Sequence, residues 1–262
     1  PEYIISYLAI ASIGGLMQTL HMPYRKSELE YLLKDSQAAA TICLSQFKEH
    51  EPASVFLQIK NSMESSMHVI SVGEPYKSAI SFTELLSTPV KHNKEDISAE
   101  DPFVLLYTSG TTSLPKGVPH RYNNFLTNAR LCSEEYDFGD TDKLLSLAPM
   151  THLYGLFAYN MCLASAASAV LLSTFSPEEF IKTVKTLQPT AIFAAPAHFA
   201  NCFHLDLLKQ EDFDSVKFVC LSGSAVQQEL AEKVDGLLQN GKVGQLWGMS
   251  ELQAGAITRL ED

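Results

Sequence analysis

The amino-acid sequence predicts an α/β fold in which a mainly parallel sheet is covered by helices on both faces. From residue 101 onward, short runs rich in Val, Leu, Ile and aromatic residues alternate with longer amphipathic stretches. Strands and helices that alternate in this order are joined by right-handed crossovers, which make neighbouring strands parallel. The polar stretch 90–102, of mixed charge, marks a boundary, so we expect one α/β subdomain over 1–95 and a second over 96–262.

The first subdomain is expected to contain helices and strands in alternation. The window 3–17 is the most apolar of the chain, but it contains serines and paired glycines, lacks a basic flank and is short for a bilayer. We therefore interpret it as a buried helix of a soluble core. A second helix is expected over 27–37, with Ser27 as N-cap and Glu30 completing a capping box. Further expected elements are strands over 38–44 and 66–73 and a helical turn over 81–88.

The second subdomain shows the alternation most clearly. Pro177 stands at the first position of the stretch 176–188, where proline favours the start of a helix. The expected strands are 101–107, 142–150, 169–174, 191–196, 216–223 and 243–251. The expected helices are 123–136, 155–168, 176–188, 198–208 and 224–238.

Charge and cysteine content narrow the classes of partner. The 30 acidic and 19 basic residues give a formal charge of −11, and no run of Lys or Arg interrupts the acidic balance. Nucleic acid and a polybasic membrane contact are therefore disfavoured, and a small-molecule partner fits better. The five cysteines are scattered, odd in number and never spaced as CxxC, which argues against a disulfide framework and a structural zinc site. A reducing, cytoplasmic location is the simplest expectation.

The stretch 107–117, YTSGTTSLPKG, follows an expected strand and gathers hydroxyl groups, glycines and one lysine. Backbone N–H groups and hydroxyls at a strand end form an anion-binding site, and Lys116 adds a positive charge, so phosphate is the favoured ligand. Gly110 to Lys116 has the spacing of a Walker A loop, but Pro115 replaces its second glycine and Gly117 replaces its Ser or Thr. A P-loop NTPase is thus disfavoured, whereas an ordinary turn of small polar residues stays open on the residues alone.

Three further stretches accompany this loop: PMTHLYG at 149–155, LSGSAV at 221–226 and QLWGMSE at 245–251. In this order the four stretches resemble the motifs of the adenylate-forming superfamily of acyl-CoA synthetases, aryl-CoA ligases, luciferases and nonribosomal adenylation domains. Ser113 stands where Gly or Glu is usual in that family, and Val226 where proline is frequent. The opening residues also resemble the family's early helix, so the resemblance spans the chain and implies two stacked, mainly parallel sheets flanked by helices.

The resemblance implies a role for each matching residue. Hydroxyls and backbone N–H groups of the loop would hold the phosphates of ATP, namely those of Thr108, Ser109, Gly110, Thr111 and Thr112. Lys116 would neutralise the charge of the departing pyrophosphate. Glu251 would bind Mg²⁺, Ser250 would bond the α-phosphate, and Trp247, in the aromatic place, would cover the adenine.

Other matching residues would border the acid. Gly223, Ser224 and Ala225 would edge the nucleotide and acyl pockets, and His152 would lie beside the substrate carboxylate. On residue type alone, plainer interpretations stay open: Trp247 as core packing, Glu251 as a solvated carboxylate and His152 as a structural histidine. His120, His198 and His204 share no ligand spacing and are interpreted as structural.

The reaction that the resemblance implies is attack of a carboxylate on the α-phosphorus of ATP, giving an acyl-adenylate and pyrophosphate. The acyl group would then pass to the thiol of coenzyme A. The segment THLYG has no acidic residue to pair an ammonium group, so an amine-free acid is favoured. Tyr154, Gly223 and Leu246, with room left by Gly248, are expected to form an apolar slot for a compact cyclic, aromatic or medium-chain acid. A larger side chain at Gly248 is expected to shift preference toward short acids.

Two other functions stay open: an adenylation domain, stand-alone or nonribosomal, that loads a carrier protein, and a non-catalytic nucleotide-binding fragment. The family's ribose-binding Asp, its hinge and its small C-terminal domain with a catalytic lysine would lie after residue 262. The family's first segment would lie before residue 1. The sequence is therefore expected to be part of the large N-terminal domain, incomplete for efficient adenylation, and it does not indicate an oligomeric state.

Overall fold

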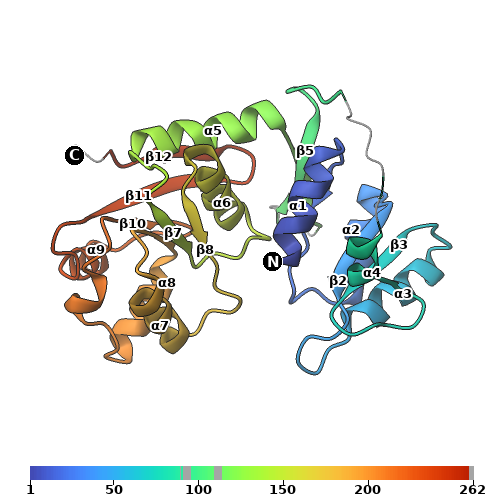
Figure 1. Ribbon diagram of the computed structural model, residues 1–262, viewed down its shortest axis with the longest axis horizontal. Coiled ribbons are helices and arrows are strands. Elements are labelled where there is room, and N and C mark those ends of the chain that lie inside the picture. The colour runs from blue at the N-terminus through green and yellow to red at the C-terminus, as the bar shows by residue number, and fades with distance from the viewer. Residues whose placement is uncertain (89, 91–95, 109–113, 260–262) are drawn as a thin grey trace. The chain divides into compact units, whose positions relative to one another are not determined.

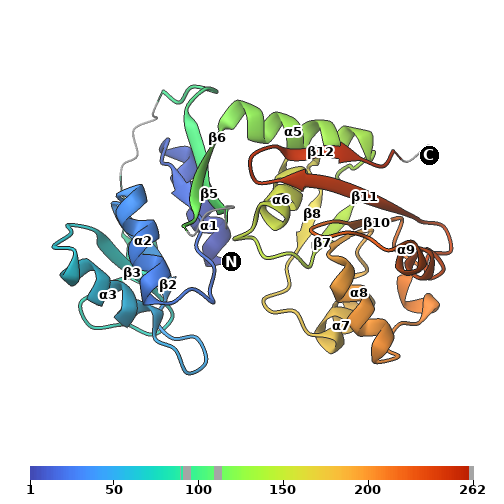
Figure 2. The same cartoon turned by 180° about the vertical axis from the view of Figure 1, so that it is seen from behind.

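The computed structural model describes residues 1–88, 90, 96–108 and 114–259, which divide into two compact units. Among these residues, the first unit comprises 1–98 with 102–105 and 114–117, and the second comprises 99–101, 106–108 and 118–259. Figure 1 shows the elements of both units by label and colour, and Figure 2 shows them from behind. Each unit is described by itself.

The first unit begins with alternating helices and short strands. Its helices are α1 (Glu2–Ser12), α2 (Lys26–Ser36), α3 (Pro52–Ser62) and α4 (Phe82–Ser87). Its strands are β1 (Met17–Gln18), β2 (Ala40–Leu44), β3 (His68–Val72) and β4 (Ile80–Ser81). Strands β2, β3 and β4 form a parallel sheet in that order. Leu29 and Leu33 of α2 and Phe56 and Ile59 of α3 are buried with Val69 of β3, so these helices cover the sheet through their apolar faces.

A second small sheet has the order β1-β5-β6, with β5 at Pro102–Thr108 and β6 at Lys116–Arg121. Strand β1 runs parallel to β5 through the pairs Met17–Val104 and Gln18–Leu105. The ring of Tyr7 on α1 lies 5.4 Å from that of Phe103, and both side chains are buried. This contact fixes α1 against the start of β5.

The second unit is built on a larger sheet, which in the described part of the chain has six strands in the order β12-β11-β10-β9-β7-β8. Its strands are β7 (Lys143–Ser146), β8 (Ser168–Val170), β9 (Ala191–Ala194), β10 (Phe218–Leu221), β11 (Lys242–Met249) and β12 (Gln253–Ile257). Its helices are α5 (Tyr122–Glu135), α6 (Leu153–Ser165), α7 (Pro177–Leu187), α8 (Pro196–His204) and α9 (Gln228–Asp235), with a 3₁₀ turn at Gln210–Phe213. All pairs are parallel except β11 with β12.

Both faces of the larger sheet are buried, and successive residues alternate between them. In β10, Val219 and Leu221 pack into a cluster with α7, α8 and α9, whereas Phe218 and Cys220 pack into a cluster with α5 and α6. Such two-sided burial explains why these strands read as continuous apolar runs. Each fully buried large apolar side chain stabilises the fold by about 1.5–3 kcal/mol. The predicted α/β class, with parallel-rich sheets flanked by helices, is confirmed, although the described strands form three sheets instead of two.

The elements predicted for the second unit are confirmed with shifts of a few residues at their ends. The prediction for the start of the chain is partly wrong. Helix α1 ends at Ser12 because Gly14 takes a left-handed φ of +68°, so Met17 lies in β1. It is also less buried than expected, since Ile5 and Leu8 are 41% and 44% exposed. Within the described residues, no helix combines the length and apolarity that a membrane crossing requires.

The predicted cap of the second helix is wrong by two residues. The backbone N–H of Arg25 donates to the Glu28 carboxylate at 2.9 Å, so the capping interaction joins these residues instead of Ser27 and Glu30. The same segment therefore starts its helix at Lys26. Elements that the sequence analysis did not predict are α3, β1, β4, β6 and β12.

Candidate active site

The carboxyl ends of the central strands of the larger sheet meet at one edge. Strands β7, β9, β10 and β11 run in the same direction, and the motif segments 149–155, 221–226 and 245–251 follow or include three of these ends. Open α/β sheets bind ligands at this edge, where the loops leave the strands. The topology therefore brings together three sequence motifs that lie far apart along the chain.

A pocket of about 540 Å³ lies among these three motifs, and we call it the motif pocket. It is lined by residues 152–154 and 157, by 221–226, by 245–250, and by Gln253 and Ala254. Of the expected site residues, it gathers His152, Tyr154, Gly223, Ser224, Ala225, Leu246, Trp247, Gly248 and Ser250. Its described lining contains no Asp, Glu, Lys or Arg, so the pocket has no formal charge of its own to pair an ammonium group.

His152 and Tyr154 enter the pocket at the start of α6. His152 is the N-cap of this helix, and its Nδ1 accepts from the backbone N–H of Tyr154 at 3.2 Å. Desolvation by the surrounding protein lowers the pKa of His152, although the residue keeps exposed surface. The imidazole is therefore neutral near pH 7, with its hydrogen on Nε2. A hydrogen there can be donated to an acid carboxylate.

Tyr154 forms part of the buried wall. Its hydroxyl donates to the backbone carbonyl of Cys220 at 2.9 Å, and burial raises the pKa of the phenol well above its ordinary value. The hydroxyl is thus a structural donor between α6 and β10, while the ring supplies apolar surface. Phe157, one helical turn after Leu153, lines the same pocket. Phe157 is not part of the motif 149–155. Because residues four apart lie on the same face of a helix, the position of Leu153 could have indicated it.

The turn after β10 depends on Gly223. This residue has a φ of +88°, which residues with a Cβ rarely adopt, and it is exposed at the pocket. Ser222 continues the pairing of β10 by donating its backbone N–H to Ala194 at 3.0 Å. The chain then turns sharply at Gly223, so that Ser224 and Ala225 border the pocket with little side-chain volume.

The hairpin of β11 and β12 forms the remaining wall. Leu246 is 8% exposed and belongs to the core cluster, whereas Trp247 is 61% exposed. The ring of Trp247 lies over Gly255, where an added Cβ would come within 2.9 Å of it. Trp247 therefore offers an open aromatic face, as expected for a residue that stacks on a base, and the interpretation as core packing is wrong.

The expectation that Gly248 leaves room for the acid needs correction. Gly248 does line the motif pocket, but a Cβ at this position would approach the backbone oxygen of Gln253 to 2.0 Å. The space beside its Cα is thus occupied by β12. The glycine is required for the close approach of the two strands at the bulge between Trp247 and Gly248. A larger residue would distort the hairpin before it shortened the pocket.

Ser250 and Glu251 lie in the turn between the two strands. Leu252 donates its backbone N–H to Met249 at 3.0 Å, which closes the turn, and Glu251 is exposed. Among the described residues, no group of three or more His, Cys, Asp or Glu side chains could hold a metal ion. A single exposed carboxylate fits Mg²⁺, which is usually bound by one or two carboxylates together with substrate phosphates.

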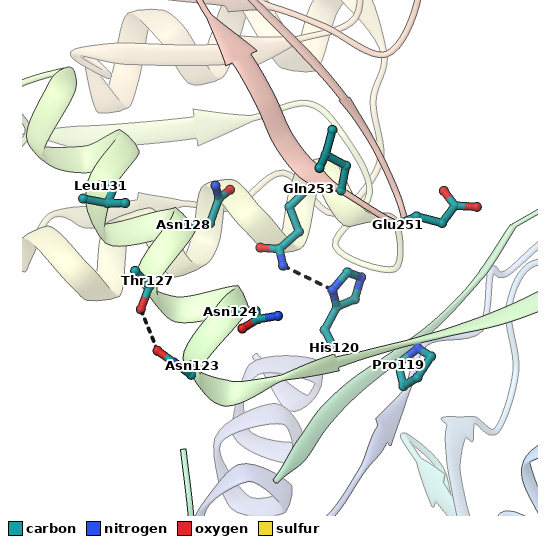
Figure 3. Close-up of a pocket in the computed structure, with 10 residues that line it drawn as sticks. Pro119, His120, Asn123, Asn124, Thr127, Asn128, Leu131, Glu251 and Gln253 are labelled. Atoms are coloured by element: carbon teal, nitrogen blue, oxygen red, sulfur yellow. Dashed lines mark hydrogen bonds between the residues drawn. The ribbon is translucent and has the colours of Figure 1, made fainter. Parts of the chain in front are cut away.

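A second hollow of about 460 Å³ borders the same turn, and we call it the polar pocket. Figure 3 shows it between α5, the end of β6 and the start of β12, with Glu251 and Gln253 on one side and Asn123, Asn124 and Asn128 on α5. His120 of β6 is 5% exposed and lies within hydrogen-bonding distance of Gln253. The sequence predicts a structural role for His120, and no motif in it indicates Gln253 or Asn128.

The phosphate loop is only partly described. Ser109, Gly110, Thr111 and Thr112 lie outside the described residues, and so does Ser113. Thr108 is the last residue of β5, and Lys116 is an exposed residue at the start of β6, where the sequence analysis expected a loop. The strand was missed because Pro119 interrupts its pattern, yet β6 lies at the edge of its sheet, where proline is tolerated.

The fold and the pocket are those of an α/β protein with a candidate ligand-binding pocket at the carboxyl edge of a parallel sheet. The model of the AMP-binding enzyme family matches residues 1–262, so the chain belongs to that family. A long-chain-fatty-acid–CoA ligase of Bacillus subtilis (strain 168) is 30% identical over 286 residues, which cover 96% of this chain and 49% of that protein. A medium-chain fatty-acid–CoA ligase of Escherichia coli (strain K12) is 24% identical and matches 100% of this chain and 46% of that protein.

Solved structures share the fold. The crystal structure of the anthranilate CoA ligase AuaEII in complex with anthranoyl-AMP matches the whole chain with a TM-score of 0.87, at 22% identity and over 51% of that protein. The chain therefore spans about half the length of the relatives that it matches.

Proposed function

We propose that this chain is the nucleotide- and acid-binding part of an AMP-forming ligase that activates a carboxylic acid with ATP and transfers the acyl group to coenzyme A. The observation that carries the proposal is the convergence of three family motifs on one uncharged pocket at the carboxyl edge of the sheet. The names of the relatives, which are acid–CoA ligases, support the same activity.

The residues of the pocket suit the first step, in which a carboxylate oxygen attacks the α-phosphorus and pyrophosphate leaves. The neutral His152 can donate from Nε2 to the acid, Trp247 can stack on the adenine, and the hydroxyl of Ser250 can bond the α-phosphate. When bound at Glu251, Mg²⁺ would screen the charge of the phosphates. Thr108, Lys116 and the loop between them would hold the β- and γ-phosphates.

The lining of the pocket favours an apolar acid without an amino group. Tyr154, Phe157 and Leu246 give it an apolar wall, and an ammonium group there would be buried without a partner. We therefore propose a compact cyclic, aromatic or medium-chain acid as the substrate. We also propose that 1–95 and 96–262 are two subdomains, the second of which carries the phosphate loop and the motif with Trp247 and Glu251.

The direct test is ATP–pyrophosphate exchange by the protein in its full natural length, with a panel of aromatic, medium-chain and amino acids and with or without coenzyme A. Exchange should require an amine-free acid, and thioester should form only when coenzyme A is added. Lys116→Ala should abolish most of the exchange, whereas Lys209→Ala, at another exposed lysine, should not change it.

Two outcomes would contradict the proposal. Exchange that depends on Lys116 but needs no acid would show a nucleotide-binding protein without the ligase activity. Transfer of the acyl group to a carrier protein, but never to coenzyme A, would identify an adenylation domain instead.

A further inference from the structure

We propose that His120, Gln253 and Asn128 are positioning residues that hold the turn carrying Ser250 and Glu251 in the conformation that binds Mg²⁺ and ATP. This inference rests on the proposed function, because it assigns these side chains a role in supporting the proposed Mg²⁺ and ATP site; Gln253 also lines the motif pocket, whereas His120 and Asn128 do not. None of the three residues belongs to the four motifs that resemble the family. All of them lie in the second unit and border the polar pocket.

Gln253 has an unusual backbone for a buried residue of its type. Its φ is +66°, in the left-handed region that residues with a Cβ enter at a cost in free energy. The residue is also buried, with only 6% of its surface exposed. Such a conformation persists where the surroundings determine it, and these positions gather at functional sites. Gln253 comes two residues after Glu251, so the direction of the turn depends on it.

His120 supplies a contact that orients Gln253. Nδ1 of the imidazole lies 3.2 Å from Nε2 of the amide, so the neutral ring accepts a hydrogen bond from Gln253, as the dashed line in Figure 3 marks. The ring is fixed by an edge contact with Phe125, 5.5 Å between centroids. Burial lowers the pKa of His120, while the Ser250 backbone and the Glu251 charge act in the opposite direction. His120 is therefore in electrostatic reach of both residues of the turn.

Asn128 holds the next residue of the strand. Its Oδ1 accepts from the backbone N–H of Ala254 at 3.2 Å, and its Nδ2 donates to the carbonyl of the same residue at 3.3 Å. A side-chain amide that bonds both backbone groups of one residue fixes the position and the orientation of that strand. Asn128 stands on α5 beside Ala129, which is fully buried, so this contact connects the turn to a rigid helix.

Gly248 completes the arrangement on the other strand. Its missing side chain lets the Gln253 carbonyl come close, as the 2.0 Å approach to an added Cβ shows. The turn from Met249 to Gln253 is thus held by β6 through His120, by α5 through Asn128 and by β11 through Gly248. The exposed carboxylate of Glu251 has no such contact of its own among the described hydrogen bonds and ion pairs, so its position depends on this backbone.

Two polar atoms of the arrangement, Nε2 of His120 and Oε1 of Gln253, are buried without a hydrogen-bond partner in the described part of the chain. The Oε1 of Gln253 is buried and lacks a hydrogen-bond donor, and it faces the polar pocket beside α5 in Figure 3. A buried acceptor in this state is costly, so another interaction of the same amide must offset the cost and is the reason for its place here. Holding the turn through the amide donor is that reason in our proposal.

The experiment compares His120→Ala and Asn128→Ala with the control His204→Ala, an exposed histidine at the end of α8, in the full-length protein. Substitution of residues that support a metal ligand typically lowers metal affinity by 10–100-fold. We expect the Mg²⁺ concentration for half-maximal ATP–pyrophosphate exchange to rise about 10-fold in the first two variants and to stay unchanged in the control. His120→Asn keeps an acceptor near the position of Nδ1 and should recover most of the Mg²⁺ affinity.

A second measurement does not depend on the reaction. Hydrogen–deuterium exchange of the backbone amides of 249–254 should be faster in His120→Ala and Asn128→Ala, and Mg²⁺ with ATP should protect them less than in the wild type. An unchanged Mg²⁺ requirement together with unchanged amide exchange would overturn the inference. If the wild type shows no pyrophosphate exchange with any acid, the proposed function fails, and the amide exchange still decides whether these residues hold the turn.

Discussion

The two hollows beside the β11–β12 hairpin are built from opposite kinds of residue. The motif pocket is lined by exposed or half-exposed groups, such as Trp247 and Gly223, and by apolar walls without formal charge. The polar pocket is lined largely by amides, an imidazole and a carboxylate, and its buried members His120 and Gln253 bond each other. In our proposal, the exposed groups, which include Glu251 of the polar pocket, contact the ligand, and the buried, hydrogen-bonded groups support the site.

This division has a measurable consequence. A residue that only contacts the ligand can be changed with loss of activity and little loss of stability, because its side chain is exposed in the free protein. A buried supporting residue cannot be changed without a cost in both. Substitutions at particular residues distinguish ligand-contacting residues from supporting residues.

The largest effect is expected at Glu251, which borders the polar pocket but is exposed. Glu251→Gln keeps the shape of the side chain and removes the negative charge that binds Mg²⁺, so the rate of ATP–pyrophosphate exchange should fall about 100-fold. The free energy of unfolding should stay within about 0.5 kcal/mol of the wild type. Glu211→Gln, at another exposed glutamate, is the matched control. A comparable loss of activity in both variants would remove Glu251 from the site.

A large loss of stability is expected on substitution of Gly155, a buried residue in the first turn of α6 beside the motif pocket. A Cβ at Gly155 would lie 2.3 Å from the Pro149 oxygen and 2.5 Å from the Ala148 oxygen, both of them backbone atoms. Gly155→Ala should therefore lower the free energy of unfolding by about 2–3 kcal/mol, measured by denaturant titration. Gly139→Ala is the control, since nothing lies within 4 Å of its added Cβ. Equal stability of the two variants would show that the start of α6 can shift without cost.

The sequence indicates the residues of the motif pocket better than those of the polar pocket. Short stretches that resemble family motifs indicate His152, Gly223 and Trp247, and all three line the motif pocket. The left-handed backbone of Gln253 and the strand β12 gave no such signal, since the turn at 250–252 contains neither Gly nor Pro. The hydrogen bond between His120 and Gln253 joins residues 133 positions apart, and spacing along the chain cannot predict such a pair.

The parallel sheet was predictable for a related reason. Strands β9 and β10 are buried on both faces, so their apolar runs are strong signals. The edge strand β6, which contains Pro119, and the two-residue strands β1 and β4 lack such runs. The misplaced cap of α2 has a local cause, because Arg25 is a poor N-cap by type and only its backbone N–H takes part.

The predicted slot for the acid can be tested at Leu246. A larger side chain at Gly248 cannot serve as the test, because its Cβ would meet the backbone of β12. Leu246→Ala removes three carbons from the buried wall of the motif pocket and should favour bulkier acids, changing the ratio of kcat/KM between a larger and a smaller acid by about 10-fold. The ratio is insensitive to the amount of folded protein. Val243→Ala, on the same strand but packed in the other core cluster, should leave the ratio unchanged. A shift of equal size in both variants would contradict the assignment of the wall.

The smallest effect on stability is expected at a histidine outside the motif pocket. It forms the same kind of helix-capping hydrogen bond as His152 inside the pocket. His152 and His198 each accept a backbone N–H through Nδ1 at the start of a helix, α6 and α8, and burial lowers the pKa of both. His198 lies outside the motif pocket, packed on Phe175 at 4.5 Å, so it reports on stability alone. Its folded pKa is below the ordinary value of 6.5, so the unfolded chain binds more protons and stability falls as the pH decreases through 6.5 and below.

His198→Gln keeps a side-chain acceptor at the third helical position and cannot be protonated. The free energy of unfolding of the variant should therefore decline less than that of the wild type between pH 7 and pH 5. The difference must stay below about 1.4 kcal/mol per pH unit, the limit for one proton. Denaturant titrations at several pH values measure it. If the two curves are parallel, protonation of His198 does not oppose folding, and the start of α8 tolerates loss of the hydrogen bond from the Ala195 N–H.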